Sequence, residues 1–135
     1  MFDYGYELKD AGLVAASAAG QVSSVDRIID VGAGLVEGKL ILDITALEIA
    51  SNNEEYEIYL QGSSSASFAG TITALASMKL GANEVLDGDV DSLIGRYQVP
   101  FRTEKNGTNY RYLREYCACA GTISSGINFS AYLGK

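Results

Sequence analysis

The residues of this chain that could carry out chemistry are few, and one common type is missing. The 135-residue sequence has no histidine, so it cannot supply a histidine general base, a Ser-His-Asp or Cys-His nucleophile system, or a histidine metal ligand. Two cysteines, Cys117 and Cys119, stand two positions apart, and no third cysteine could complete a metal site. On a strand they would point to the same face, a poor geometry for a disulfide, so we expect free, buried thiols.

Carboxylates are the remaining candidates for chemistry. The segment Asp87-Gly88-Asp89-Val90-Asp91 has the alternating acids of a calcium loop, but it lacks the glycine and the glutamate that an EF-hand requires, which favours a solvated acidic loop. Glu55 and Glu57 share one face of a predicted strand, but that face is expected to be exposed to solvent rather than in a cleft. We therefore predict no catalytic residue, no metal and no cofactor, and we expect that the protein is not an enzyme.

The net charge of −7 is unevenly distributed along the chain. Residues 96–114 carry five basic residues and one acidic residue, a net charge of +4, which leaves −11 for the rest of the chain. Overall acidity argues against nucleic-acid binding, which depends on contacts from lysine and arginine to phosphates. The asymmetry favours pairing with a complementary protein surface or with copies of the same chain. Ordinary solvated strand faces are an equally good alternative.

The first residues, MFDYGYELKD, lack the basic region and apolar run of a signal peptide. No stretch of the sequence approaches 18 consecutive apolar residues. We therefore expect a protein that is made in the cytoplasm and has no membrane partner.

Short strands are the elements that must position these residues. Apolar and polar residues alternate in Lys39–Ile49, Glu55–Gln61 and Ile127–Leu133, and turn residues recur about every eight to twelve positions, which is typical of an antiparallel sandwich or barrel. Pro100 indicates an edge strand or a bulge, because proline cannot donate to a sheet. The Asn106-Gly107 pair predicts a tight hairpin that joins the flanking strands antiparallel.

The N-terminal segment, residues 1–21, is rich in Ala, Gly and Ser and lacks a sustained apolar stripe. We interpret it as an extended arm that docks on a neighbouring surface through Tyr4 and Tyr6, which are large amphipathic anchors. A frayed terminus is the alternative. Residues 22–135 then form the β domain.

A series of small-residue and strand patterns runs in order along almost the whole chain. In chain order the patterns are Asp10-Ala11, Ala15-Ala16-Ser17-Ala18, Ser23-Ser24-Val25-Asp26, Ile29-Asp30-Val31-Gly32, Glu37-Gly38-Lys39-Leu40, Tyr56-Glu57-Ile58-Tyr59-Leu60-Gln61 with a Ser-rich loop ending in Phe68, Tyr110-Arg111-Tyr112-Leu113-Arg114, and Ala120-Gly121-Thr122. In this order and spacing the chain resembles the Bbp16-type capsid cement (decoration) proteins of tailed bacteriophages.

This resemblance implies a jelly-roll protein on the outer surface of the capsid of the virion. There it would bind the major capsid protein, stabilise its lattice against the pressure of packaged DNA, and lack enzymatic activity. Repetition on local symmetry axes suggests a homo-oligomer. We predict six contact residues, two on the arm and four on the basic strands: Tyr4, Tyr6, Arg96, Arg102, Arg111 and Arg114.

The arginines are chosen because a guanidinium pairs with a carboxylate through two hydrogen bonds. Their alternative is pairing with acids of the same chain. Two other functions stay open: a jelly-roll binding module for a carbohydrate or receptor, with Tyr59 and the loop of residues 62–70 as its site, and a minor head–tail structural component.

Overall fold

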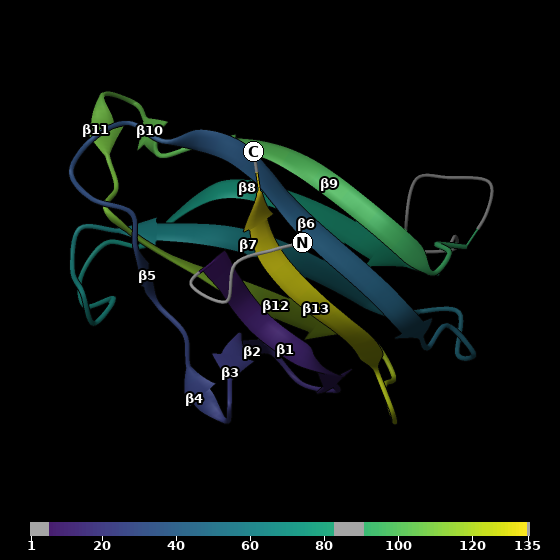
Figure 1. The fold of residues 1–135 in the computed structure, drawn as a ribbon. Coiled ribbons are helices and arrows are strands. Elements are labelled where there is room, and N and C mark those ends of the chain that lie inside the picture. The colour runs from purple at the N-terminus through teal and green to yellow at the C-terminus, as the bar shows by residue number, and fades with distance from the viewer. Residues whose placement is uncertain (1–5, 83–90, 135) are drawn as a thin grey trace.

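Two antiparallel sheets packed face to face make up the fold (Figure 1). The structure is a computed structural model that describes residues 6–82 and 91–134. The first sheet has the strand order β1-β13-β6-β9, and its strands span Glu7–Val14, Ile127–Gly134, Glu37–Leu47 and Gly95–Arg102. The second has the order β2-β12-β7-β8, and its strands span Ala18–Ala19, Tyr112–Ala120, Glu55–Ser63 and Thr73–Gly81. The predicted all-β antiparallel sandwich is confirmed.

Three shorter pieces complete the strands. β5 (Ile29–Asp30) also pairs with β12. β3 (Gln21–Val22) pairs with β4 (Val25–Asp26), and β10 (Glu104–Lys105) pairs with β11 (Thr108–Asn109). Within the described ranges the chain forms no helix, and therefore none that could span a membrane.

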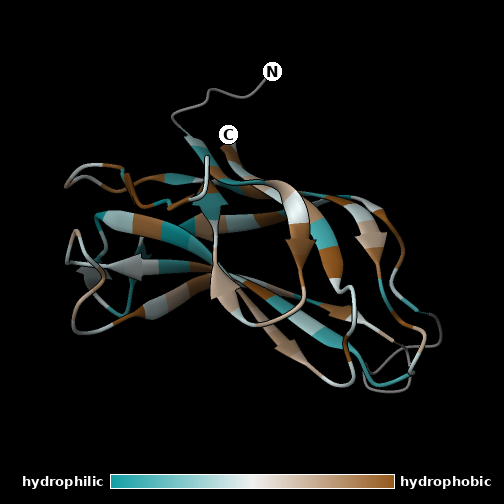
Figure 2. Ribbon diagram, turned by 90° about the horizontal axis from the view of Figure 1, so that it is seen from below, coloured by the Kyte–Doolittle hydropathy of each residue, from teal (hydrophilic) through white to brown (hydrophobic). Residues whose placement is uncertain are grey.

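The core lies between the two sheets, because each strand turns its apolar residues inward. On β6, Leu40, Leu42 and Ile44 are at most 3% exposed. β7 and β13 contribute alternate residues in the same way, and the alternation of apolar and polar residues along the strands is visible in Figure 2. Burying one such side chain stabilises the fold by about 1.5–3 kcal/mol. This pattern fixes which side chains face outward.

The predicted hairpin across Asn106-Gly107 is smaller than expected. β9 pairs with β6 at the edge of the first sheet, as Pro100 indicated, whereas β12 pairs with β7 in the second sheet. The expected pairing of the two flanking strands is therefore wrong. The turn, with φ of 53° at Asn106 and 86° at Gly107, closes only the ribbon of β10 and β11. Thr103, which is fully buried, holds the segment that leads from β9 in the first sheet to β12 in the second. Its backbone N–H donates to the Val36 carbonyl oxygen, and its carbonyl oxygen accepts from the N–H of Tyr110.

The segment predicted as an arm lies, where it is described, within the sandwich. β1 pairs with β13, and Leu8 on this strand is fully buried in the core. β2 pairs with β12 in the opposite sheet. A boundary between residues 21 and 22 therefore does not separate an arm from a domain. The chain crosses here from β1 in the first sheet to β2 in the second, and its small residues allow the backbone segments to lie close together. A Cβ on Gly20, for example, would lie 2.5 Å from the Leu8 carbonyl oxygen.

Candidate interaction surfaces

Two of the four predicted arginines form ion pairs with two hydrogen bonds each within the chain. Arg96 on β9 donates to both carboxylate oxygens of Asp43 on β6, at 2.7 and 3.0 Å. Arg111, just before β12, donates likewise to Asp30 on β5, at 2.7 and 2.9 Å. The hydrogen bonds from Arg111 and from the backbone N–H of Gly32 lower the pKa of Asp30. Both guanidiniums thus already have carboxylate partners.

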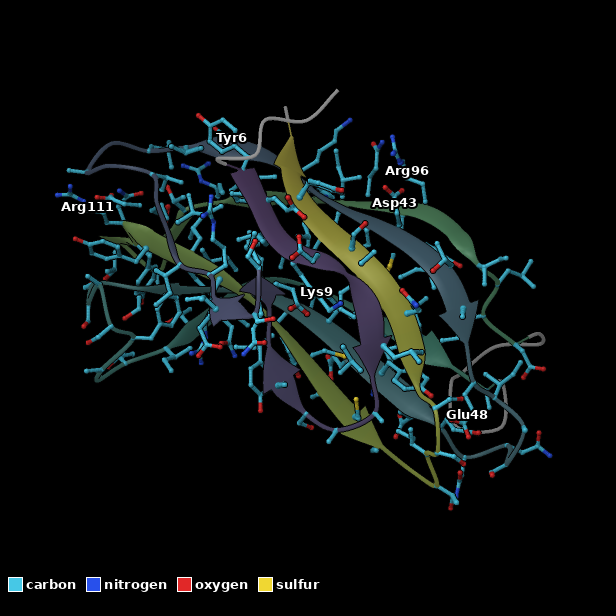
Figure 3. All side chains as sticks on the ribbon, turned by 60° about the horizontal axis from the view of Figure 1, so that its bottom comes forward. Tyr6, Lys9, Asp43, Glu48, Arg96 and Arg111 are labelled. Atoms are coloured by element: carbon cyan, nitrogen blue, oxygen red, sulfur yellow. The ribbon has the colours of Figure 1, made fainter. Side chains whose placement is uncertain are left out.

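The predicted arginines do not form one patch. Arg102, at the end of β9, lies 3.8 Å from Glu104. Arg96 and Arg111 lie well apart, on elements of different sheets (Figure 3). The basic stretch of residues 96–114 is therefore divided between the sheets. Arg96, Arg102 and Arg111 therefore pair with acids of the same chain and do not form one shared basic surface.

Arg114 has different surroundings. Its Nε donates to the side-chain oxygen of Gln61 on β7, at 2.8 Å, which is a neutral acceptor. Its guanidinium carbon lies 4.5 Å from the ring centre of Phe68 and 5.7 Å from that of Tyr116. Phe68 belongs to the Ser-rich loop of residues 62–70, and its side chain is buried. Aromatic contacts of this kind hold a guanidinium in place without neutralising it.

Arg114 belongs to an outward-facing group of side chains on the second sheet. Tyr116 lies opposite Tyr59 across the pairing of β12 with β7, and Arg114 lies opposite Gln61. Tyr112 precedes them on the same face of β12, and the Arg111 guanidinium lies 5.6 Å from its ring. All of these β7 and β12 side chains are partly exposed. We call the following set the Tyr–Arg face: Tyr59, Gln61, Tyr112, Arg114 and Tyr116.

Sequence reasoning found part of this face, Arg114 and Tyr59, but did not select Tyr112 or Tyr116 as contact residues. The signal was present, because Tyr112, Arg114 and Tyr116 follow each other at the spacing of two that places strand residues on one face. The contact residues on these strands were predicted from basic charge, which selects the arginines and not the tyrosines beside them.

Of the two predicted tyrosine anchors, the structure describes Tyr6. Tyr6 lies just before β1 and is 49% exposed (Figure 3). Tyr4 lies outside the described residues. Tyr6 therefore projects from the start of an edge strand that is itself built into the first sheet.

An open cavity of about 460 Å³ runs beside β1 and β2, and half of the residues that line it are Ala or Gly. Three polar side chains at its wall, Lys9, Asp10 and Gln21, have partners within the chain. Asp10 accepts a hydrogen bond from the backbone N–H of Ser23 at 2.7 Å, and Gln21 donates to Asp26 at 2.9 Å.

The two cysteines are neighbours in the structure but are not bonded to each other. Cys117 and Cys119 are free, with sulfur atoms 3.9 Å apart, and burial raises the pKa of both thiols, which keeps them protonated. Of the acidic loop, Asp87 and Asp89 lie outside the described residues. Within residues 6–82 and 91–134 no group of three or more His, Cys, Asp or Glu is placed to hold a metal ion.

Comparison with known proteins adds no relative to this picture. No protein-family model matches the chain, and no curated protein matches its sequence.

Proposed function

We propose that this chain is a capsid decoration protein of a tailed bacteriophage, without enzymatic activity, which binds the outer surface of the head and stabilises the lattice of the major capsid protein. The observation that carries the proposal is the strand order. The two small ribbons, β3-β4 and β10-β11, are left out of the count, and β2 and β5 are counted as one position, which leaves eight strands. One sheet then contains the first, eighth, third and sixth strands, and the other contains the second, seventh, fourth and fifth. Two Greek keys folded together give this order, which favours a jelly roll, an architecture used by viral capsid proteins.

The proposed mechanism is linkage between binding and assembly. A protein that binds the assembled shell better than free subunits stabilises the shell by mass action. Many copies on a symmetric lattice gain avidity from contacts that are weak one by one. Self-association at local symmetry axes belongs to the same proposal. Neither nucleic acid nor a membrane is a partner in it.

Copy number tests this proposal most directly. The purified protein is mixed with empty expanded heads of its phage and the heads are sedimented. We expect it to cosediment at a fixed ratio to the major capsid protein, and to occur at the same ratio in purified virions. A few copies for each virion would instead indicate a head–tail component and would overturn the proposal.

A binding module for carbohydrate is the second candidate, and one observation favours it. Tyr59 and Tyr116 lie side by side on the outer face of the second sheet, where aromatic rings could stack on sugars. Binding to a glycan array without binding to heads would establish this second function instead of the first.

A further inference from the structure

Arg114 is the predicted arginine whose guanidinium has no carboxylate partner in the described part of the chain. Arg96, Arg102 and Arg111 each lie within 4 Å of an Asp or Glu oxygen. The hydrogen-bond acceptor of Arg114 is the amide oxygen of Gln61. A guanidinium has five donors, so one bond from Nε leaves the terminal nitrogens available to a further acceptor.

The guanidinium of Arg114 is also held in position before any partner arrives. Phe68 lies 4.5 Å from it and is only 6% exposed, so this ring is fixed by the protein around it. Gln61 sits directly opposite Arg114 in the ladder of β7 and β12 and fixes the Nε edge. An arginine already ordered in this way loses less side-chain freedom on binding than a free surface arginine.

The surroundings of Arg114 match the composition of protein–protein interfaces. Tyr and Arg are, with Trp, the residues enriched at the energetic centres of such interfaces, and lysine is depleted from interfaces. The Tyr–Arg face contains three tyrosines and this arginine on two paired strands. Ion pairs occur on both outer faces, between Asp43 and Arg96 on the first sheet and between Glu55 and Lys79 on the second, but neither includes a residue of the Tyr–Arg face.

We propose that the Tyr–Arg face is the surface that docks on the capsid, and that Arg114 there receives a carboxylate of an acidic region of the major capsid protein. The proposal rests on the function proposed above. The tyrosine rings would exclude water around the pair, and Arg114 would bind the carboxylate through its terminal nitrogens.

The first test replaces the charge on each outer face in turn. Arg114→Gln removes the charge on the Tyr–Arg face, and Arg114→Lys keeps the charge but loses the planar fork. Lys39→Gln is the matched control, because Lys39 is an exposed cation on the first sheet. We expect Arg114→Gln to bind empty expanded heads about tenfold or more weakly, Arg114→Lys to bind with intermediate affinity, and Lys39→Gln to bind as the wild type does.

The second test needs no variant. Hydroxyl-radical footprinting of the wild-type protein on heads should protect Tyr59, Tyr112 and Tyr116, while Tyr132 on the first sheet keeps its reactivity. Protection of Tyr132 alone, or equal head binding by Arg114→Gln and wild type, would overturn the docking surface and leave the decoration function standing. Failure of the wild type to bind heads would overturn both. If Arg114→Gln loses only self-association in sedimentation velocity, the occupant is a second copy and the proposal is wrong.

Discussion

Two glutamates of this sandwich have opposite surroundings, and the contrast shows what a carboxylate needs in a β-protein. Glu48, just after β6, accepts hydrogen bonds of 2.7 to 3.1 Å from the backbone N–H groups of residues 124–126. Glu115, on β12, is fully buried, and neither of its carboxylate oxygens has a hydrogen-bond partner in the described structure. The first carboxylate closes a turn, whereas the second lies in the core.

The two environments move the pKa values in opposite directions. The backbone N–H of Gly126, and then those of the two serines before it, lower the pKa of Glu48. Burial raises the pKa of Glu115 to about 8, although the positive charges of Lys9 and Arg114 act against it. At Glu48 the hydrogen-bond donors thus lower the pKa by more than burial raises it. At Glu115 no donor of the described residues reaches the carboxylate, so burial determines the direction of the pKa shift.

The positive charge of Lys9 does not restore an ordinary pKa to Glu115, because the hydrogen bonds of its ammonium go to backbone carbonyl oxygens. Its ammonium donates to the carbonyl oxygens of Asp10, Gly12 and Phe129 at 2.9, 3.0 and 2.7 Å (Figure 3 labels Lys9 beside β1). The bond to Phe129 joins β1 to β13, and the other two lie within β1, where the register of the two strands shifts. The lysine is therefore used to hold the irregular edge strand, and burial lowers its pKa.

The largest effect is expected when Lys9 is replaced. Lys9→Met keeps most of the side-chain volume but removes the ammonium donor from three carbonyl oxygens and one of the two positive charges that act on Glu115. We expect a loss of about 3–5 kcal/mol in the free energy of unfolding, measured by urea titration. Lys39→Met, at an exposed position on β6, is the control and should change little. Equal stability of the two variants would mean that the buried bonds of Lys9 do not stabilise the fold.

Gly126 should give the next largest effect, because it belongs to the turn that Glu48 closes. It has φ of 87°, and a Cβ there would collide with the backbone of Val14. Gly107 has nearly the same φ, 86°, with nothing within 4 Å of a Cβ. We expect Gly126→Ala to cost about 3 kcal/mol or more and Gly107→Ala about 1 kcal/mol, by thermal and urea unfolding. Equal costs would show that conformation alone, and not the close approach to Val14, requires glycine.

The sequence could predict the strands of this fold better than their partners. Alternation in Glu55–Gln61 and Ile127–Leu133 is a local property, and both segments are strands with the expected buried faces. The Asn106-Gly107 turn is local too, but it determines only a two-residue ladder. The partners of β9 and β12 depend on which long strands lie in the same sheet, and turn chemistry carries no information about that.

The Tyr–Arg face was likewise predictable only where it depends on local spacing. Spacing of two along β12 places Leu113, Glu115 and Cys117 inward and the Tyr–Arg face outward. What the sequence could not reveal is that Arg114 meets Gln61 and Phe68 rather than an acid, since those residues are more than 40 positions away. The function itself stays a prediction that the head-binding experiments test.

A smaller effect is expected at Glu115, and it depends on pH. Its pKa is about 8 in the folded protein against an ordinary 4.5, so the folded state binds the extra proton between these values. Stability from Glu115 is therefore fully present below about pH 4.5, falls as the pH rises, and is lost above about pH 8. Glu115→Gln, which cannot ionise, should match the wild type near pH 5 and exceed it by about 1–3 kcal/mol near pH 9. A constant difference across this range would mean that Glu115 does not titrate as its burial requires.

The smallest effect is expected for Glu48→Gln, and it should have the opposite pH dependence. The amide keeps one acceptor oxygen for the turn of residues 124–126 but loses the charge that strengthens these bonds. The pKa of Glu48 is lowered by folding, so its contribution is present above the ordinary pKa and is lost as the pH falls through the folded value. We expect a modest fall in Tm at pH 7 that disappears in acid, whereas Glu37→Gln, an exposed glutamate at the start of β6, should leave Tm unchanged at both. A Tm difference that persists in acid would show that the turn needs the shape of Glu48 and not its charge, and the contrast with Glu115 would then be one of packing alone.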